Sequence, residues 1–139
     1  RWRLVAFGAA EDMGQPTGDI AKLCGALQRG TIARFTPKGA EIDSVIDLRV
    51  VFQASHREMK LEALPDLLLP RKGKFGLIDY EKAFCPDLKN GPDIFDHRGI
   101  DRATGALLIV RPDQFVAEVL PLTAHDAVSL FFDGIMLPA

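Results

Sequence analysis

Long hydrophobic runs are missing from this chain of 139 residues: none approaches the roughly 18 to 20 residues that cross a bilayer. The first residues also lack the apolar run and cleavage site of a signal peptide, so we expect a cytoplasmic protein without a membrane partner. Positive charge is not in excess, because the net charge is −2, and no broad basic cluster indicates nucleic-acid binding. The size and the 47% hydrophobic content predict one domain over residues 1–139.

Cysteine is scarce, and its placement argues against redox or metal chemistry. Cys24 and Cys85 lie far apart and match neither a zinc-binding nor a C-x-x-C spacing. Cys24 falls on the apolar face of a predicted helix, which indicates a core residue. Cys85 is the one thiol that an oxidoreductase or peroxidase could use, and this alternative stays open, although no basic neighbour is evident that would stabilise its thiolate.

Motifs for other chemistries are also absent. The three histidines share no metal-ligand spacing, and the chain has no G-x-S-x-G, G-x-G-x-x-G or G-x-x-x-x-G-K motif. His125, Asp126 and Ser129 crowd one helical turn, but without a nucleophile elbow they indicate a polar helix face. We therefore predict no catalytic residue, no metal ligand and no cofactor contact in these 139 residues.

The first half of the chain shows clear periodicity. Residues 2–7 predict a strand, and a helix is expected to begin with Thr17 as its N-cap and to end at Gly30. Residues 45–52 predict a second strand with one fully apolar face. The predicted apolar face of the helix contains Ile20, Leu23, Cys24 and Leu27, and that of the strand contains Ile46, Leu48, Val50 and Phe52.

The middle of the chain is less regular. Residues 53–70 can be drawn as a short helix or as extended chain, and this choice stays open. Residues 75–79 predict a short strand and residues 80–90 irregular structure. Just before the predicted strand 75–79, Arg71, Lys72 and Lys74 form a basic turn, which indicates either a solvated loop or a contact with another domain of the same chain.

The last third predicts a short helix within residues 92–99, a hairpin over residues 105–122 and a final helix. The apolar run 106–110 is typical of a strand covered on both faces. For the final helix we expect Thr123 as N-cap, Gly134 as its end, and an apolar face made of Ala127, Leu130 and Phe131. The element order predicts an α/β, thioredoxin-like fold: a central mixed β-sheet with helices on both faces, a C-terminal β-hairpin and a final helix.

The hairpin also carries a recognisable signature. Gly99 and Ile100 precede its first strand, and its turn reads Arg111-Pro112-Asp113-Gln114-Phe115-Val116. This pattern resembles the C-terminal domain of FAD-dependent aromatic hydroxylases of the phenol 2-monooxygenase group. Segments 35–37, 42–45, 56–58, 67–73 and 75–82 are similar to the 3-hydroxybenzoate 4-monooxygenase branch of that family.

The resemblance implies a noncatalytic appendage that helps to hold a homodimer together and packs on the flavin-binding and substrate domains of the same chain. The parent enzyme would use FAD, NADPH and dioxygen to hydroxylate a phenolic ring, whereas this fragment would bind no cofactor. The chain starts without methionine and almost at once with a strand, which agrees with a C-terminal piece of a longer flavoprotein.

Overall fold

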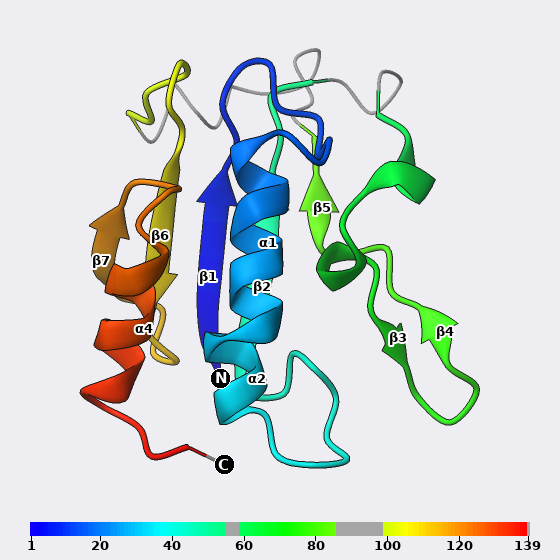
Figure 1. Ribbon diagram of the computed structural model, residues 1–139, viewed down its shortest axis with the longest axis vertical. Coiled ribbons are helices and arrows are strands. Elements are labelled where there is room, and N and C mark those ends of the chain that lie inside the picture. Colours follow the sequence, from blue (N-terminus) through cyan, green and yellow to red (C-terminus); the bar gives the residue numbers. More distant parts are fainter. Residues whose placement is uncertain (55–58, 86–98, 139) are drawn as a thin grey trace.

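A five-stranded mixed sheet organises the chain (Figure 1), in a computed structural model that describes residues 1–54, 59–85 and 99–138. The strands are β1 (Trp2–Phe7), β2 (Ile46–Val51), β5 (Ala83–Phe84), β6 (Ala106–Val110) and β7 (Val116–Leu120). Their order in the sheet is β5-β2-β1-β6-β7. β1 and β5 run parallel to β2, whereas β6 is antiparallel to both β1 and β7.

Helices α1 (Asp19–Arg29), α2 (Thr31–Phe35) and α4 (His125–Asp133) lie on one face of this sheet (Figure 1). The helix that the sequence predicts within residues 92–99 falls outside the described residues. The predicted α/β, thioredoxin-like arrangement is confirmed in its mixed central sheet, C-terminal strand pair and final helix. Because the described helices cover one face, the predicted helix cover of the other face stays a prediction. None of the helices in the described ranges has the length and apolar character to span a membrane.

The main core lies between the helices and one face of the sheet. Leu4 and Ala6 of β1 and Val50 of β2 are fully buried there. The predicted apolar faces of the first helix and of the second strand are confirmed, since all their members belong to this core. Burial of these faces supplies most of the free energy that holds the sheet and helices together.

The start of α1 differs from the prediction. Gly18, not Thr17, is the N-cap, and it makes no side-chain capping bond. Instead the buried carboxylate of Asp12 accepts hydrogen bonds from the backbone N–H groups of Ile20 and Gly14, at 2.9 Å each. A residue from the preceding loop therefore caps the helix, and such a distant cap leaves no local signal in the sequence.

The C-terminal elements also need two corrections. In α4 the buried residues are Val128 and Phe132, while Leu130 is exposed and the N-cap is Ala124. The Phe132 ring packs on Phe35 at a centroid distance of 6.3 Å and edge-on against Trp2 at 5.5 Å, whereas Phe131 also contacts Trp2 at 5.5 Å but is only partly buried. In β6 the burial alternates, with Leu107 and Ile109 buried and the other three residues half-buried, so this strand is covered fully on one face only.

The middle segment contains short elements that periodicity could not resolve. Two 3-10 turns, η1 (Leu61–Ala63) and η2 (Asp66–Leu68), precede a hairpin of β3 (Arg71–Lys72) and β4 (Leu77–Ile78). The stretch predicted to be irregular contains β5, which joins the sheet beside β2. The N–H of Val50 donates to the carbonyl of Lys82, and that of Phe52 to the carbonyl of Phe84, over 2.8 Å each.

Candidate interface: an ion-anchored hairpin arm

Residues 70–80, which we call the arm, project away from the sheet as a small hairpin (Figure 1). β3 and β4 pair antiparallel, and the N–H of Asp79 donates to the carbonyl of Pro70 over 2.8 Å to close the base. Gly73 and Gly76 adopt φ angles of +72° and +61°, a conformation that disfavours side chains. The turn therefore depends on glycine at both positions.

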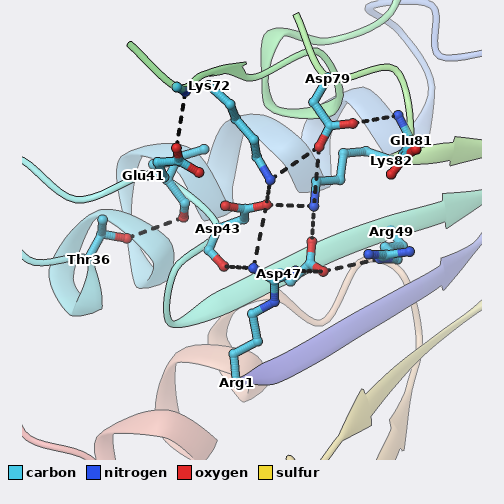
Figure 2. Close-up of polar contacts among 12 residues, drawn as sticks. Arg1, Thr36, Glu41, Asp43, Asp47, Arg49, Lys72, Asp79, Glu81 and Lys82 are labelled. Atoms are coloured by element: carbon cyan, nitrogen blue, oxygen red, sulfur yellow. Dashed lines mark hydrogen bonds and ion pairs between the residues drawn. The ribbon is translucent and has the colours of Figure 1, made fainter.

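A buried ammonium group anchors the chain where it leaves the arm. Lys82 is only 2% exposed, and its Nζ lies 2.6 Å from Oδ2 of Asp43 and 2.6 Å from Oδ1 of Asp47 (Figure 2). Asp47 is a fully buried residue of β2. A buried charge is tolerated only when it is paired and hydrogen-bonded, so these two carboxylates hold Lys82 and β5 against β2.

A second lysine, Lys72, ties the arm itself to one of these carboxylates, Asp43. The Lys72 ammonium forms an ion pair with Asp43 and lies 3.2 Å from Oδ2 of Asp79. Burial alone would raise the pKa of Asp43, but hydrogen bonds from Lys72 and Lys82 outweigh it and lower that pKa. Burial likewise opposes the charge of Lys72, yet its bonds to Asp43 and Asp79 raise its pKa. Both groups are therefore charged at neutral pH.

Further contacts complete this cluster, which we call the anchor. The Arg49 Nε lies 3.1 Å from Oδ2 of Asp47, and Arg1 Nη2 lies 3.6 Å from the same oxygen (Figure 2). The backbone N–H of Gly73 donates to Oε1 of Glu41 over 3.1 Å. The anchor consists of Arg1, Asp43, Asp47, Arg49, Lys72, Asp79 and Lys82. It fixes the direction of the arm by contacts from both β2 and the loop before it.

The outer side chains of the arm are apolar and exposed. Phe75 is 84% exposed, Leu77 70% and Tyr80 56%. Single exposed apolar residues are ordinary, but three within six positions of a protruding hairpin form a patch typical of a protein–protein contact. Together with the anchor, this patch makes the arm a candidate interface. The hairpin of β6 and β7 exposes Phe115, Val116 and Val119 in a similar way but has no such anchor among the described residues.

The structure places the basic residues that the sequence singled out in two environments. Arg71 and Lys74 are exposed, and the Arg71 guanidinium donates to the carbonyl of Gly76 over 3.2 Å. Lys72 instead directs its ammonium into the anchor. The predicted contact of these residues with another domain stays a prediction. Sequence reasoning missed the anchor, although an aspartate within the apolar strand 45–52 was a usable signal for Asp47.

The signature residues of the second hairpin build its turn. The Arg111 side chain donates to the Asp113 carboxylate over 2.7 Å, and its N–H donates to the Phe115 carbonyl over 2.8 Å. Gln114 has a φ of +76°, a left-handed conformation that glycine adopts without strain. Upstream, Gly99 also has a positive φ, and Ile100 packs near Phe7 and Val51. The complete signature consists of Gly99, Ile100, Arg111, Pro112, Asp113, Gln114, Phe115 and Val116. These residues serve a turn and packing.

Neither cysteine has the surroundings of a reactive thiol. Burial, assisted by the nearby charge of Asp12, raises the pKa of Cys24 to about 12. Burial also raises the pKa of Cys85. A nucleophilic thiol needs the opposite shift, so the structure offers no support for the thiol oxidoreductase alternative.

The N-terminus of α1 does not fit the pyrophosphate of a dinucleotide either. A flavin or nicotinamide dinucleotide would place its pyrophosphate at the N-terminus of the helix that follows the first strand. At the start of α1 the Asp12 carboxylate already accepts the N–H of Ile20, and it would repel a phosphate. No group of three or more His, Cys, Asp or Glu side chains suited to a metal occurs in the ranges that the structure covers.

Comparison with known proteins decides the family. The family described as phenol hydroxylase, C-terminal dimerisation domain, matches residues 1–139. The chain belongs to this family. It is 54% identical to 3-hydroxybenzoate 4-monooxygenase from Comamonas testosteroni over 140 residues, and 35% identical to FAD-dependent monooxygenase terD from Aspergillus terreus (strain NIH 2624 / FGSC A1156) over 140 residues.

These alignments cover 98% and 96% of this dimerisation domain but only 22% of each relative. The domain therefore spans about a fifth of the length of the curated relatives that it matches. The match confirms the resemblance that the hairpin signature indicated, and it extends over the arm and the anchor as well as over the signature.

Proposed function

We propose that this chain is the C-terminal assembly domain of an FAD-dependent aromatic ring monooxygenase of the phenol hydroxylase or 3-hydroxybenzoate hydroxylase type. The observation that carries the proposal is the match to the dimerisation family along the whole chain. The domain joins two copies of the parent and packs on the flavin-binding and substrate domains of its own chain. The exposed apolar patch of the arm supports this role, because it is suited to contact with another protein surface.

In this proposal the chemistry lies outside the 139 residues. The parent holds FAD, takes a hydride from NADPH and adds one oxygen atom of dioxygen to a phenolic ring in the cytoplasm. The occupied N-terminus of α1 supports placing the flavin in another domain, since Asp12 satisfies the N–H groups that a pyrophosphate would need. The domain contributes to activity through assembly and contributes no catalytic residue.

The proposal is tested by comparing the complete gene product with a version truncated before residue 1 of this chain. Sedimentation velocity should show a dimer for the complete protein and a monomer for the truncated one, while both retain FAD absorbance. Tight, stoichiometric FAD binding by residues 1–139 alone would contradict the assignment. So would a complete protein that is monomeric at micromolar concentration.

A further inference from the structure

We propose that the arm is the element that reaches the second subunit, inserting Phe75, Leu77 and Tyr80 into an apolar surface of the partner copy. This inference rests on the proposed function, since it assumes that the parent is a homodimer. The inference identifies the arm as the surface that makes the dimer contact. It assigns the second copy, rather than the flavin-binding body of the same chain, as the protein that binds the arm.

The anchor makes the arm a rigid donor. Its base is closed by the Asp79–Pro70 hydrogen bond, and Lys72 ties its first strand to Asp43. Movement of the arm toward the core of its own domain would break the partly buried Lys72–Asp43 ion pair and the Gly73–Glu41 hydrogen bond. A hairpin fixed in this way loses little conformational entropy when it docks, which favours binding.

Interface size favours the second copy as the occupant. The exposed parts of Phe75, Leu77 and Tyr80 amount to roughly 350 Å² of side-chain surface. One arm contact buries about 700 Å² when both surfaces are counted, which is below the ~1,000 Å² that a specific interface between separate subunits needs. In a two-fold dimer each contact occurs twice, so two arms bury about 1,400 Å², which is in the range of stable complexes.

Charge defines the surface that receives the arm. The ammonium groups of Lys72 and Lys82 are neutralised within the anchor, but Arg71 and Lys74 remain exposed beside the apolar patch. The receiving surface is therefore an apolar depression with carboxylates at its rim. Such complementary charges fix the register of a contact and speed association more than they add affinity.

The first test asks which chain the tip touches. Phe75 is replaced by the photo-crosslinker p-benzoylphenylalanine in the complete gene product, and equal amounts of isotopically light and heavy protein are mixed and allowed to re-equilibrate. We expect light–heavy species to make up about half of the cross-linked dimers from position 75. The same label at Phe115, which is exposed in the other hairpin, serves as the control. Cross-links within one subunit only would overturn the inference and assign the arm to the body.

The second test measures the energetic role of the patch. Phe75→Asp/Leu77→Asp should raise the dimer dissociation constant at least about 30-fold, the effect of losing an interface hot spot. Circular dichroism and FAD content should not change, because both side chains are exposed. Phe115→Asp should leave the constant unchanged. If the unmodified protein is dimeric and the arm variant dimerises equally well, the inference fails while the proposed function stands; if the unmodified protein is a monomer, the proposed function itself fails.

Discussion

Replacing Lys82 with methionine would remove the ammonium group at the centre of the anchor and leave its two carboxylate partners. Methionine has a similar length and volume, so the main change is the loss of charge. Asp43 and Asp47 each lie 2.6 Å from the lost Nζ and are almost completely buried. Removal of one member of a buried ion pair costs about 3–5 kcal/mol of unfolding free energy. For a domain of this size that corresponds to a fall in melting temperature of roughly 12–20 °C.

Two further variants separate the loss of this charge from a general loss of packing. Lys72→Met also removes an ammonium from the anchor, but the Lys72 side chain is 24% exposed and Asp43 keeps Lys82, so we expect a loss of about 1 kcal/mol. Lys82→Met/Asp47→Leu removes both members of the most buried pair. It should be more stable than Lys82→Met alone, because Arg1 and Arg49 are partly exposed and can be hydrated.

The assay is thermal and urea unfolding followed by circular dichroism at pH 7 and pH 5. In Lys82→Met the buried carboxylates keep only the partly exposed Lys72, Arg49 and Arg1 as partners among the described residues. Protonation of a carboxyl then relieves part of the excess negative charge, so the destabilisation should shrink as the pH falls. A melting temperature within 2 °C of the parent domain, or a double variant less stable than Lys82→Met, would refute the account of the anchor.

Three other predictions follow from particular contacts. Ile109→Asp should destabilise the domain by about 3 kcal/mol or more and Val110→Asp by clearly less, because Ile109 is fully buried and Val110 is half-buried; equal melting temperatures would contradict the one-sided burial of β6. Asp12→Ala should cost about 1–2 kcal/mol in urea unfolding through loss of the α1 cap, and a smaller loss than in a matched surface Asp→Ala variant would exclude that role. The anchor also sets a pH window. Folding lowers the pKa of Asp43, so this group stabilises the fold fully above its ordinary pKa of 3.8, and the stabilisation is lost as the pH falls through the pKa of the folded state. Folding raises the pKa of Lys72, so this group stabilises the fold fully below its ordinary pKa of 10.5, and the stabilisation is lost as the pH rises through the pKa of the folded state. A stability plateau between these limits is expected from melts across pH, and a steady slope through neutral pH would oppose it.

The parts of the fold that the sequence predicted are those with a strong local period. The predicted apolar faces of α1 and β2 are buried, although in β2 the second face, with Asp47 and Val51, is buried as well. In α4 the prediction failed because Val128, Leu130, Phe131 and Phe132 make the helix apolar over most of its surface. With apolar residues on several sides, spacing does not select the inner face, which depends on packing with distant residues such as Phe35.

The candidate site was less predictable because its contacts join distant parts of the chain. Lys82 and Asp47 are separated by 35 positions, and β5 is two residues long, too short to show a period. The basic turn did draw attention to the arm. The sequence predicted a short strand over residues 75–79 without indicating its exposure, and only the structure shows that Phe75 and Leu77 lie on the outside.

The strand order has a consequence for how many bodies this domain can touch at once. The arm lies beyond the β5 edge of the sheet and the signature hairpin forms the β7 edge (Figure 1). Four interstrand spacings separate these edges, a span of about 19 Å. Proteins bound at the two edges would therefore not compete for space. A substitution that abolishes one attachment should leave the other intact.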